Sequence, residues 1–437
     1  MRPGSILVLA ALALAGCVQP LAIETASTAT PIAGQAVSWD AAKELQGSPG
    51  DVHSFAGLAQ CLATEACDAP DAPCTDVNCE TRDVVVPPGA GQLAVLVRWP
   101  TDHSIWFGIH VKDASGQVVA KGASTAVDHL GAAAIVDKPA PGTYKVEVVA
   151  LQGKGRYQAA ARVLPEAAPE SGARELLPDI VALPPSDLRI EDPPATGFAY
   201  LMVVPGEVSQ AATGAMGAKG CGLDEAMNGA RRCLRFSTGV ANVGDGPLDI
   251  ILSLQDGATS AAGGRFVQKI LLADGTTKLA PAGPAEYHAV HGHWHNAAVN
   301  RNVVYAYDEA TKTRGEVVKE GKKVGICFAD VGVMNVSYAR PDLPTHSGVE
   351  CINPAVGKTW SMGLARGWFD LYDWVLSDQF VDVAGLADGT YTLCSTPNAL
   401  QTLHESDPDN NEACSPFRLT GDKVERLDAA PYYESPE

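Results

Sequence analysis

The sequence predicts a mainly β protein, with an N-terminal β-sandwich followed by a second domain that is also mostly strands. The 437 residues include 43 glycines and 30 prolines, a composition typical of chains with many turns and few long helices. Stretches such as 93–99 and 142–149 alternate apolar and polar residues between turn signals, which is the pattern of half-buried strands. The length is about that of two domains.

The first seventeen residues are typical of a secretory signal. Arg2 precedes an apolar run over 6–15 that is too short to span a bilayer. The run ends in Leu-Ala-Gly-Cys17, which resembles a bacterial lipobox, where the signal is cleaved before an acylated cysteine. We expect a lipoprotein signal peptide over 1–17 and a lipid anchor at Cys17 in the bacterial cell envelope, on the periplasmic or surface face of the outer membrane. An ordinary signal peptide with an incidental cysteine is the alternative.

Composition divides the rest of the chain. We expect a tether over 18–50, a disulfide-containing β-sandwich over 51–165, a Pro/Ala/Glu-rich linker over 166–176, a second domain over 177–425 and a C-terminal tail over 426–437. In the second domain the expected strands are 234–243, 248–254, 299–307, 323–328, 380–383 and 390–393, with one short helix near 223–232.

The cysteine count suits an oxidising compartment. Eleven cysteines without Cys17 leave ten, enough for five disulfides. Cys61, Cys67, Cys74 and Cys79 lie together without the CxxC spacing of a zinc knuckle. Two local disulfides are expected there, and their pairing stays open.

The charge and the scattered histidines limit the function of the chain. The net charge of −19 argues against nucleic-acid binding. It would attract cationic substrates or metal ions, although it also serves solubility. His103, His110 and His129 are dispersed in the first domain, where we expect surface or structural roles and no catalytic constellation.

One histidine-rich stretch stands out. His288, His291, His293 and His295 are four of the ten histidines and fall within eight residues. On a strand the last three share one face. Their outer Cα atoms would lie about 13 Å apart, so the strand must bend for all three to reach one ion. Neutral imidazole suits Cu, Zn, Fe or Ni. A polar strand face of unrelated histidines is the alternative.

The stretch resembles the copper-binding segment of the lysyl oxidases. The match extends to Leu234-Arg-Phe followed by Val243-Gly-Asp-Gly, to Lys323 four residues before Cys327, and to Gly367-x-x-Asp370-x-Tyr372. It covers about residues 177–420. The resemblance implies a β-sandwich catalytic domain with long loops.

The resemblance also implies a copper amine oxidase. His291, His293 and His295 would bind copper, and Lys323 and Tyr372 would form a lysine tyrosylquinone, an organic electron sink placed near the metal. A primary amine, as a small amine or peptidyl lysine, would react with O2 to give an aldehyde, ammonia and hydrogen peroxide. His288, which has the opposite strand parity, would line the site, and either His288 or Asp370 would remove the substrate proton.

A second metal site is implied near the C-terminus. The segment Glu405-Ser-Asp407-Pro-Asp-Asn410-Asn411 offers hard oxygen donors, which suit Ca2+. It resembles the calcium loop of lysyl oxidases, in which Asp179 would add a carboxylate and Ile180 a backbone carbonyl. The ion would pin the last hairpin to the first strand of the domain. An ordinary acidic turn is the alternative.

The cysteines follow the family only in part. The implied disulfides are Cys221–Cys233, Cys327–Cys351 and Cys394–Cys414. Val290 replaces a family cysteine, and Trp368 and Asp378 stand where animal members have a disulfide. We therefore expect the loop that carries Tyr372 to be less constrained.

Two other functions remain open. The chain could be a copper-binding or structural extracellular domain without redox chemistry, or a zinc hydrolase using the same three histidines. The hydrolase lacks a glutamate in an HExxH arrangement. Lys323 and Tyr372 discriminate, because only the oxidase requires both near the metal.

Overall fold

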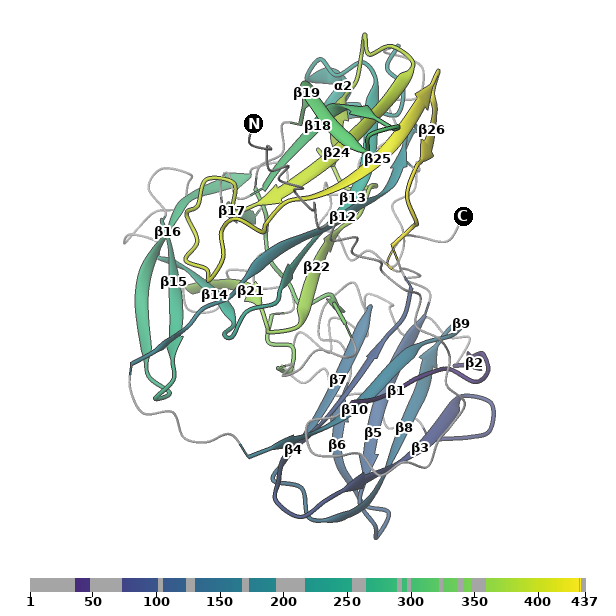
Figure 1. The fold of residues 1–437 in the computed structure, drawn as a ribbon, viewed down its shortest axis with the longest axis vertical. Coiled ribbons are helices and arrows are strands. Elements are labelled where there is room, and N and C mark those ends of the chain that lie inside the picture. The colour runs from purple at the N-terminus through teal and green to yellow at the C-terminus, as the bar shows by residue number, and fades with distance from the viewer. Residues whose placement is uncertain are drawn as a thin grey trace, which may run out of the picture. The chain divides into compact units, whose positions relative to one another are not determined.

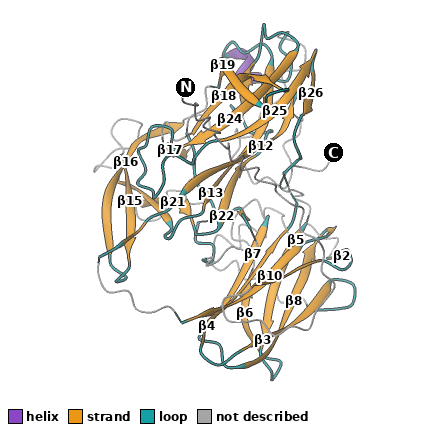
Figure 2. Ribbon diagram, in the orientation of Figure 1, coloured by secondary structure: helices purple, strands orange, loops and turns teal. Residues whose placement is uncertain are grey.

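The computed structural model describes most of the chain between residues 36 and 433. The described residues are 36–47, 73–100, 105–122, 130–166, 173–193, 217–253, 265–288, 293–296, 300–321, 325–335, 342–346, 359–431 and 433. In these ranges the fold is mainly β, as predicted, and the helix is the five-residue α2 (Leu223–Met227) (Figure 2). None of the described helical structure is long and apolar enough to cross a membrane.

The N-terminal region is a β-sandwich of two four-stranded antiparallel sheets (Figure 1). One sheet has the order β1-β10-β4-β7 and the other β3-β8-β5-β6, while β2 pairs with β9. The strands are β1 (Ala36–Asp40), β2 (Leu45–Gln46), β3 (Cys79–Val86), β4 (Ala90–Arg98), β5 (Trp106–Lys112), β6 (Val118–Gly122), β7 (Gly131–Asp137), β8 (Gly142–Gln152), β9 (Lys154–Gly155) and β10 (Gln158–Pro165).

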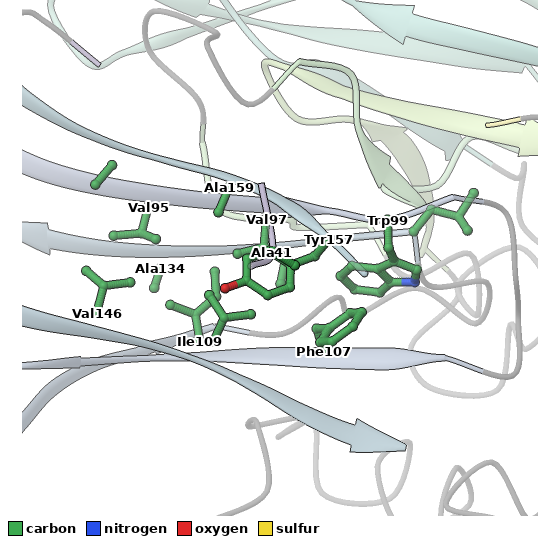
Figure 3. Close-up of a cluster of buried hydrophobic side chains, with 14 of the residues drawn as sticks. Ala41, Val95, Val97, Trp99, Phe107, Ile109, Ala134, Val146, Tyr157 and Ala159 are labelled. Atoms are coloured by element: carbon green, nitrogen blue, oxygen red, sulfur yellow. The ribbon is translucent and has the colours of Figure 1, made fainter. Parts of the chain in front are cut away.

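Alternating apolar residues form the core of this sandwich. Val95 and Val97 of β4 point to the same interior as Ile109 of β5 (Figure 3), because residues two apart share a strand face. The Phe107 ring packs edge-on against Trp99 with 5.4 Å between ring centroids. The alternation seen in the sequence is therefore the alternation of this core.

The second region contains three further sheets. Their orders are β17-β16-β15-β14-β21 with β11 beside β15, β12-β13-β22-β20 with β23 beside β13, and β19-β18-β24-β25-β26. The strands are β11 (Glu175–Leu176), β12 (Ile180–Arg189), β13 (Cys233–Asn242), β14 (Leu248–Ser253), β15 (Arg265–Leu272), β16 (Thr277–His288), β17 (His293–Asn296), β18 (Asn300–Asp308), β19 (Thr313–Glu320), β20 (Gly332–Val333), β21 (Thr359–Leu364), β22 (Trp368–Tyr372), β23 (Phe380–Asp382), β24 (Gly389–Pro397), β25 (Ala413–Thr420) and β26 (Lys423–Arg426).

Some expected elements differ from the observed ones. The strand expected over 323–328 is wrong for its described part, where Ile326 makes only an isolated bridge to Asn296. Glu175 and Leu176, expected in a linker, pair with β15. Tyr433, expected in a tail, is buried and its hydroxyl donates to the Pro184 carbonyl at 2.5 Å.

β13 is the central element of the second region. All ten of its residues are buried. β12 pairs along one edge, and β22 and β23 lie end to end along the other, with Thr238 opposite Tyr372 and Arg235 opposite Phe380. The loop between β22 and β23 therefore starts at Tyr372.

The histidine-rich stretch forms a hairpin at one edge of its sheet. β16 pairs with β15 as far as Pro284 and with β17 from Ala285 onward. Gly283 lies at this change of partner with a φ of 92°, a conformation that glycine adopts without steric cost. Gly283 thus allows β16 to pair first with β15 and then with β17.

The described residues contain three complete disulfides. Cys221–Cys233 and Cys394–Cys414 are pairs that the family resemblance implied, and Cys74–Cys79 joins residues of the first region. Cys327 is also disulfide-bonded. Cys351, its expected partner, lies outside the described residues, as do Cys17, Cys61 and Cys67.

Candidate functional site

The β16–β17 hairpin brings together three of the four clustered histidine positions. His288 is directly opposite His293, and Glu286 is opposite His295. These pairs are neighbouring positions across one antiparallel ladder. The opposite parity expected for His288 assumed one continuous strand, whereas β16 ends at His288 and β17 begins at His293, so the role of His288 stays a prediction. His291 lies outside the described residues.

Asn296 connects this hairpin to the segment that follows Lys323. Its backbone N–H donates to the Ile326 carbonyl at 3.3 Å, and its side-chain amide donates to the Ala282 carbonyl at 2.8 Å. The Asn296 side chain is fully buried, and its Oδ1 finds no hydrogen-bond partner among the described residues. Asn296 therefore fixes the end of β17 against Ile326.

Tyr372 contacts the residue next to Ile326. Its hydroxyl donates to the Cys327 carbonyl at 2.8 Å and accepts the Cys327 N–H at 2.5 Å. The ring is half-buried beside a core cluster that includes Ile326 and Phe328. The dipeptide 326–327 thus touches both the hairpin and the Tyr372 phenol. Lys323, four residues earlier, lies outside the described residues.

Asp370 lies in β22 two residues before Tyr372 and is buried. It is opposite Val240 of β13, and the two-residue period places it on the same strand face as Tyr372. Asp370 therefore lies on the strand that carries Tyr372. His288 lies at the end of β16, in the histidine hairpin. Trp374, two residues after Tyr372, lies under the Arg189 guanidinium, whose Cζ is 4.4 Å from the ring centroid.

Asp330 is a buried carboxylate that sequence reasoning missed. It accepts backbone N–H groups from Thr345 at 2.7 Å, His346 at 2.9 Å and Ala365 at 2.7 Å. Burial raises its pKa to about 6, although His346 and the N–H donors act in the opposite direction. A lone aspartate carries no sequence signal, so only the fold reveals this anchor, three residues after Cys327.

The expected calcium residues lie close together but already have hydrogen-bond partners. Asn410 donates from its side-chain amide to both Asp179 carboxylate oxygens, at 3.0 and 3.3 Å. Glu405 accepts the Ile180 N–H at 3.0 Å and the Asn411 side-chain amide at 2.9 Å. Asn411 Oδ1 is buried with no hydrogen-bond partner among the described residues.

These contacts have electrostatic consequences. Burial raises the pKa of Asp179, and the nearby Asp407 raises it further, while the Asn410 amide lowers it. Burial also raises the pKa of Glu405. Direct hydrogen bonds already join the last hairpin to the start of the domain, which is the role that the sequence assigned to the ion.

The first region carries a buried charged group where no catalytic constellation was expected. The His110 imidazole lies 3.6 Å from the Glu147 carboxylate, which also accepts a hydrogen bond from the Lys112 ammonium at 2.5 Å. Burial is the main cause of the lowered pKa of His110. His103 and His129 lie outside the described residues.

Clusters of possible metal ligands in the described part of the chain all include a disulfide. They are Cys74, Cys79 and Glu147, and Cys394, Glu412 and Cys414. Thiolate, not disulfide sulfur, is the metal ligand, so neither cluster is a metal site in this state.

Comparison with known proteins finds a match within the second region. The lysyl oxidase family model matches residues 262–428. The protein-lysine 6-oxidases of Gallus gallus, Sus scrofa and Bos taurus are each 26% identical over 160 residues, 36% of this chain. The chain covers 34%, 57% and 34% of these relatives.

Comparison with solved structures does not extend this match. A Bacillus licheniformis lipase in its propeptide form matches over 52% of this chain and 48% of its own, with 12% identity and a TM-score of 0.15, too low to indicate a shared fold. The family match, in contrast, contains the histidine hairpin, the Lys323 segment, Tyr372 and the 405–411 loop. Residues 262–428 are therefore similar to the lysyl oxidase family.

Proposed function

We propose that this protein oxidises primary amines with O2, forming an aldehyde, ammonia and hydrogen peroxide with the consumption of one water. One observation carries the proposal. The dipeptide Ile326–Cys327 contacts the histidine hairpin through Asn296 and the Tyr372 phenol through its own backbone. These contacts, made by described residues close to Lys323 in the sequence, support the proposal.

The copper ligands in this proposal are His291, His293 and His295. Imidazole nitrogen is a preferred donor for Cu(II), and positions 293 and 295 alternate along β17. This donor set fits the metal. Bound copper and a quinone made from Lys323 and Tyr372 would supply the electron sink for amine oxidation.

The residues of the chain would orient the Tyr372 phenol and accept the substrate proton. The two Cys327 hydrogen bonds fix the Tyr372 phenol. Four residues extend at most about 14 Å, so the Cα of Lys323 lies within that distance of Cys327 and its side chain adds further reach. Asp370 or His288 would accept the substrate α-proton.

The substrate, the anchor and the calcium site extend this proposal. A chain with a net charge of −19 would attract cationic amines, including lysine-bearing proteins. Acylation at Cys17 would hold the enzyme on a membrane of the bacterial envelope. A calcium ion at Asp179, Glu405, Asp407, Asn410 and Asn411, with the Ile180 carbonyl, would reinforce the contacts that already join the two ends of the domain.

A second candidate is a copper-binding domain without redox chemistry. The Tyr372 hydroxyl both donates and accepts a backbone hydrogen bond, as a purely structural tyrosine would. Under this alternative Tyr372 and Lys323 stay unmodified when copper binds.

Mass spectrometry of copper-loaded protein separates the two candidates. The oxidase predicts a cross-linked peptide that joins positions 323 and 372, and phenylhydrazine colour that disappears in Tyr372→Phe. It also predicts that Lys323→Ala stops peroxide production. Two unmodified peptides in protein that binds copper stoichiometrically would instead establish the binding domain.

A further inference from the structure

Arg235 and Glu225 form an ion pair in which both side chains are fully buried, with 2.7 Å between Arg235 Nη1 and Glu225 Oε2. Removing two charges from water is costly, and their mutual attraction offsets the cost only when further hydrogen bonds satisfy the remaining donors and acceptors. The identity of those further partners indicates what the pair does.

The remaining groups of the pair bind the loop that follows Tyr372. Arg235 Nε donates to the Trp374 carbonyl at 2.6 Å, and Arg235 Nη2 donates to the Leu376 carbonyl at 2.6 Å. Glu225 Oε1 accepts the Asp378 N–H at 2.9 Å. The fork of a guanidinium suits two acceptors at fixed positions. Three backbone groups of one short loop are thus held by two side chains.

This loop lies between two ladders of β13. The β13–β22 ladder ends with Tyr372, and the β13–β23 ladder ends with Phe380. In the gap, Ser237 of β13 accepts the Trp374 N–H at 3.0 Å. Side chains of β13 therefore replace the missing ladder bonds, and they begin two residues after the phenol. These hydrogen bonds constrain the loop without a disulfide.

We propose that Arg235 and Glu225 are positioning residues that hold the Tyr372 phenol on the Cys327 backbone. This inference rests on the proposed function for its purpose but not for its test. The Arg235–Glu225 pair fixes the backbone on the C-terminal side of Tyr372, while the β13–β22 ladder fixes it on the N-terminal side. A phenol held from both sides keeps one orientation toward the Lys323 segment.

The first experiment uses metal-free protein, in which the phenol is unmodified. Tyrosine labelled with 13C at Cζ gives one NMR signal per residue, and Tyr372→Phe assigns the signal of Tyr372. The test variant is the double substitution Arg235→Met and Glu225→Met, since apolar replacement of a buried pair often preserves stability. We expect the Tyr372 signal to broaden or to move toward that of a solvent-exposed tyrosine, while the other tyrosine signals stay in place.

A matched control tests whether loss of any buried ion pair has this effect. Lys112→Met with Glu147→Met removes the pair of the first region and should leave the Tyr372 signal unchanged. Arg235→Lys keeps the charge beside Glu225 but cannot span both carbonyls, so it should give an intermediate signal. If the double variant fails to fold, Arg235→Lys decides alone. An unchanged Tyr372 signal in either folded variant overturns the proposal.

Copper loading then gives an independent readout. A displacement of about 1 Å costs on the order of 100-fold in rate, so the quinone absorbance should appear on the order of 100-fold more slowly in the double variant, with partial rescue in Arg235→Lys. If the wild-type protein forms no quinone, the proposed function fails while the NMR result still decides the positioning role. If the wild type and the folded double variant form it equally fast, the positioning role fails alone.

Discussion

The β-sandwich of β1–β10 and the region of β11–β26 bury different chemistry. In the described part of the sandwich the buried polar or charged side chains are His110 and Glu147, and the rest of the buried set is apolar. The second region buries Arg235, Glu225 and Asp330 among many other polar groups. Apolar burial stabilises a fold without regard to direction, whereas buried polar groups must meet specific partners. The interior of the second region therefore contains the directional polar contacts that a chemical site requires.

The largest expected effect comes from breaking the buried pair of the second region. Arg235→Ala leaves Glu225 as an uncompensated buried charge, so the free energy of unfolding should fall by about 3–5 kcal/mol. Denaturant unfolding measures it. Lys112→Ala in the sandwich, where the Lys112 side chain is partly exposed, should cost much less. Equal losses for the two substitutions would abolish the contrast between the regions.

The pH dependence of stability tests Asp330. Its folded pKa of about 6 lies above its ordinary value of 3.8, so the folded state favours the protonated carboxyl. The stabilisation is complete below pH 3.8 and is lost as the pH rises through 6, by about 3 kcal/mol in total. Unfolding of the wild type and of Asp330→Asn should be compared at pH 4 and 7. The wild type should lose about that much relative to the variant, and parallel curves would contradict the assignment.

Gly283 tests the base of the histidine hairpin. An alanine there would adopt a positive φ and place its Cβ 3.1 Å from Thr402, which should cost about 2 kcal/mol. Gly275→Ala is a matched control, because its φ is 82° and an added Cβ meets nothing within 4 Å. Thermal unfolding should show the larger loss for Gly283→Ala. A smaller loss than in the control would mean that the Thr402 contact relaxes without cost.

A conservative change in the sandwich gives the smallest effect. Ile109→Val removes one buried methylene and should lower the free energy of unfolding by about 1 kcal/mol. The Tyr372 NMR signal should not move, because Ile109 and Tyr372 belong to different hydrophobic clusters. A shifted signal would show that the sandwich also positions the phenol.

The sequence was informative wherever periodicity or a local pattern carried the signal. Alternation predicted the sandwich core around Val95 and Ile109. The family pattern pointed to the segment before Cys327 and to Tyr372, whose hydroxyl hydrogen-bonds the Cys327 backbone. The break between β16 and β17 could not be predicted, since periodicity does not tell where a strand turns back.

Long-range polar contacts were beyond the sequence for a different reason. Arg235 meets Trp374 and Leu376, which lie about 140 positions away. No local pattern marks such pairs, because their partners are backbone carbonyls that every residue has. The same holds for Asp330, whose three partners are N–H groups.

The Tyr372 hydroxyl forms hydrogen bonds with main-chain groups. Both of its hydrogen bonds go to the N–H and carbonyl of residue 327, groups that nearly every amino acid supplies. Mutational drift at that position can thus alter the disulfide and leave the phenol's anchor intact. Proline has no N–H and would remove one of the two hydrogen bonds. Other substitutions at position 327 would remove the disulfide and keep both hydrogen bonds to the Tyr372 hydroxyl.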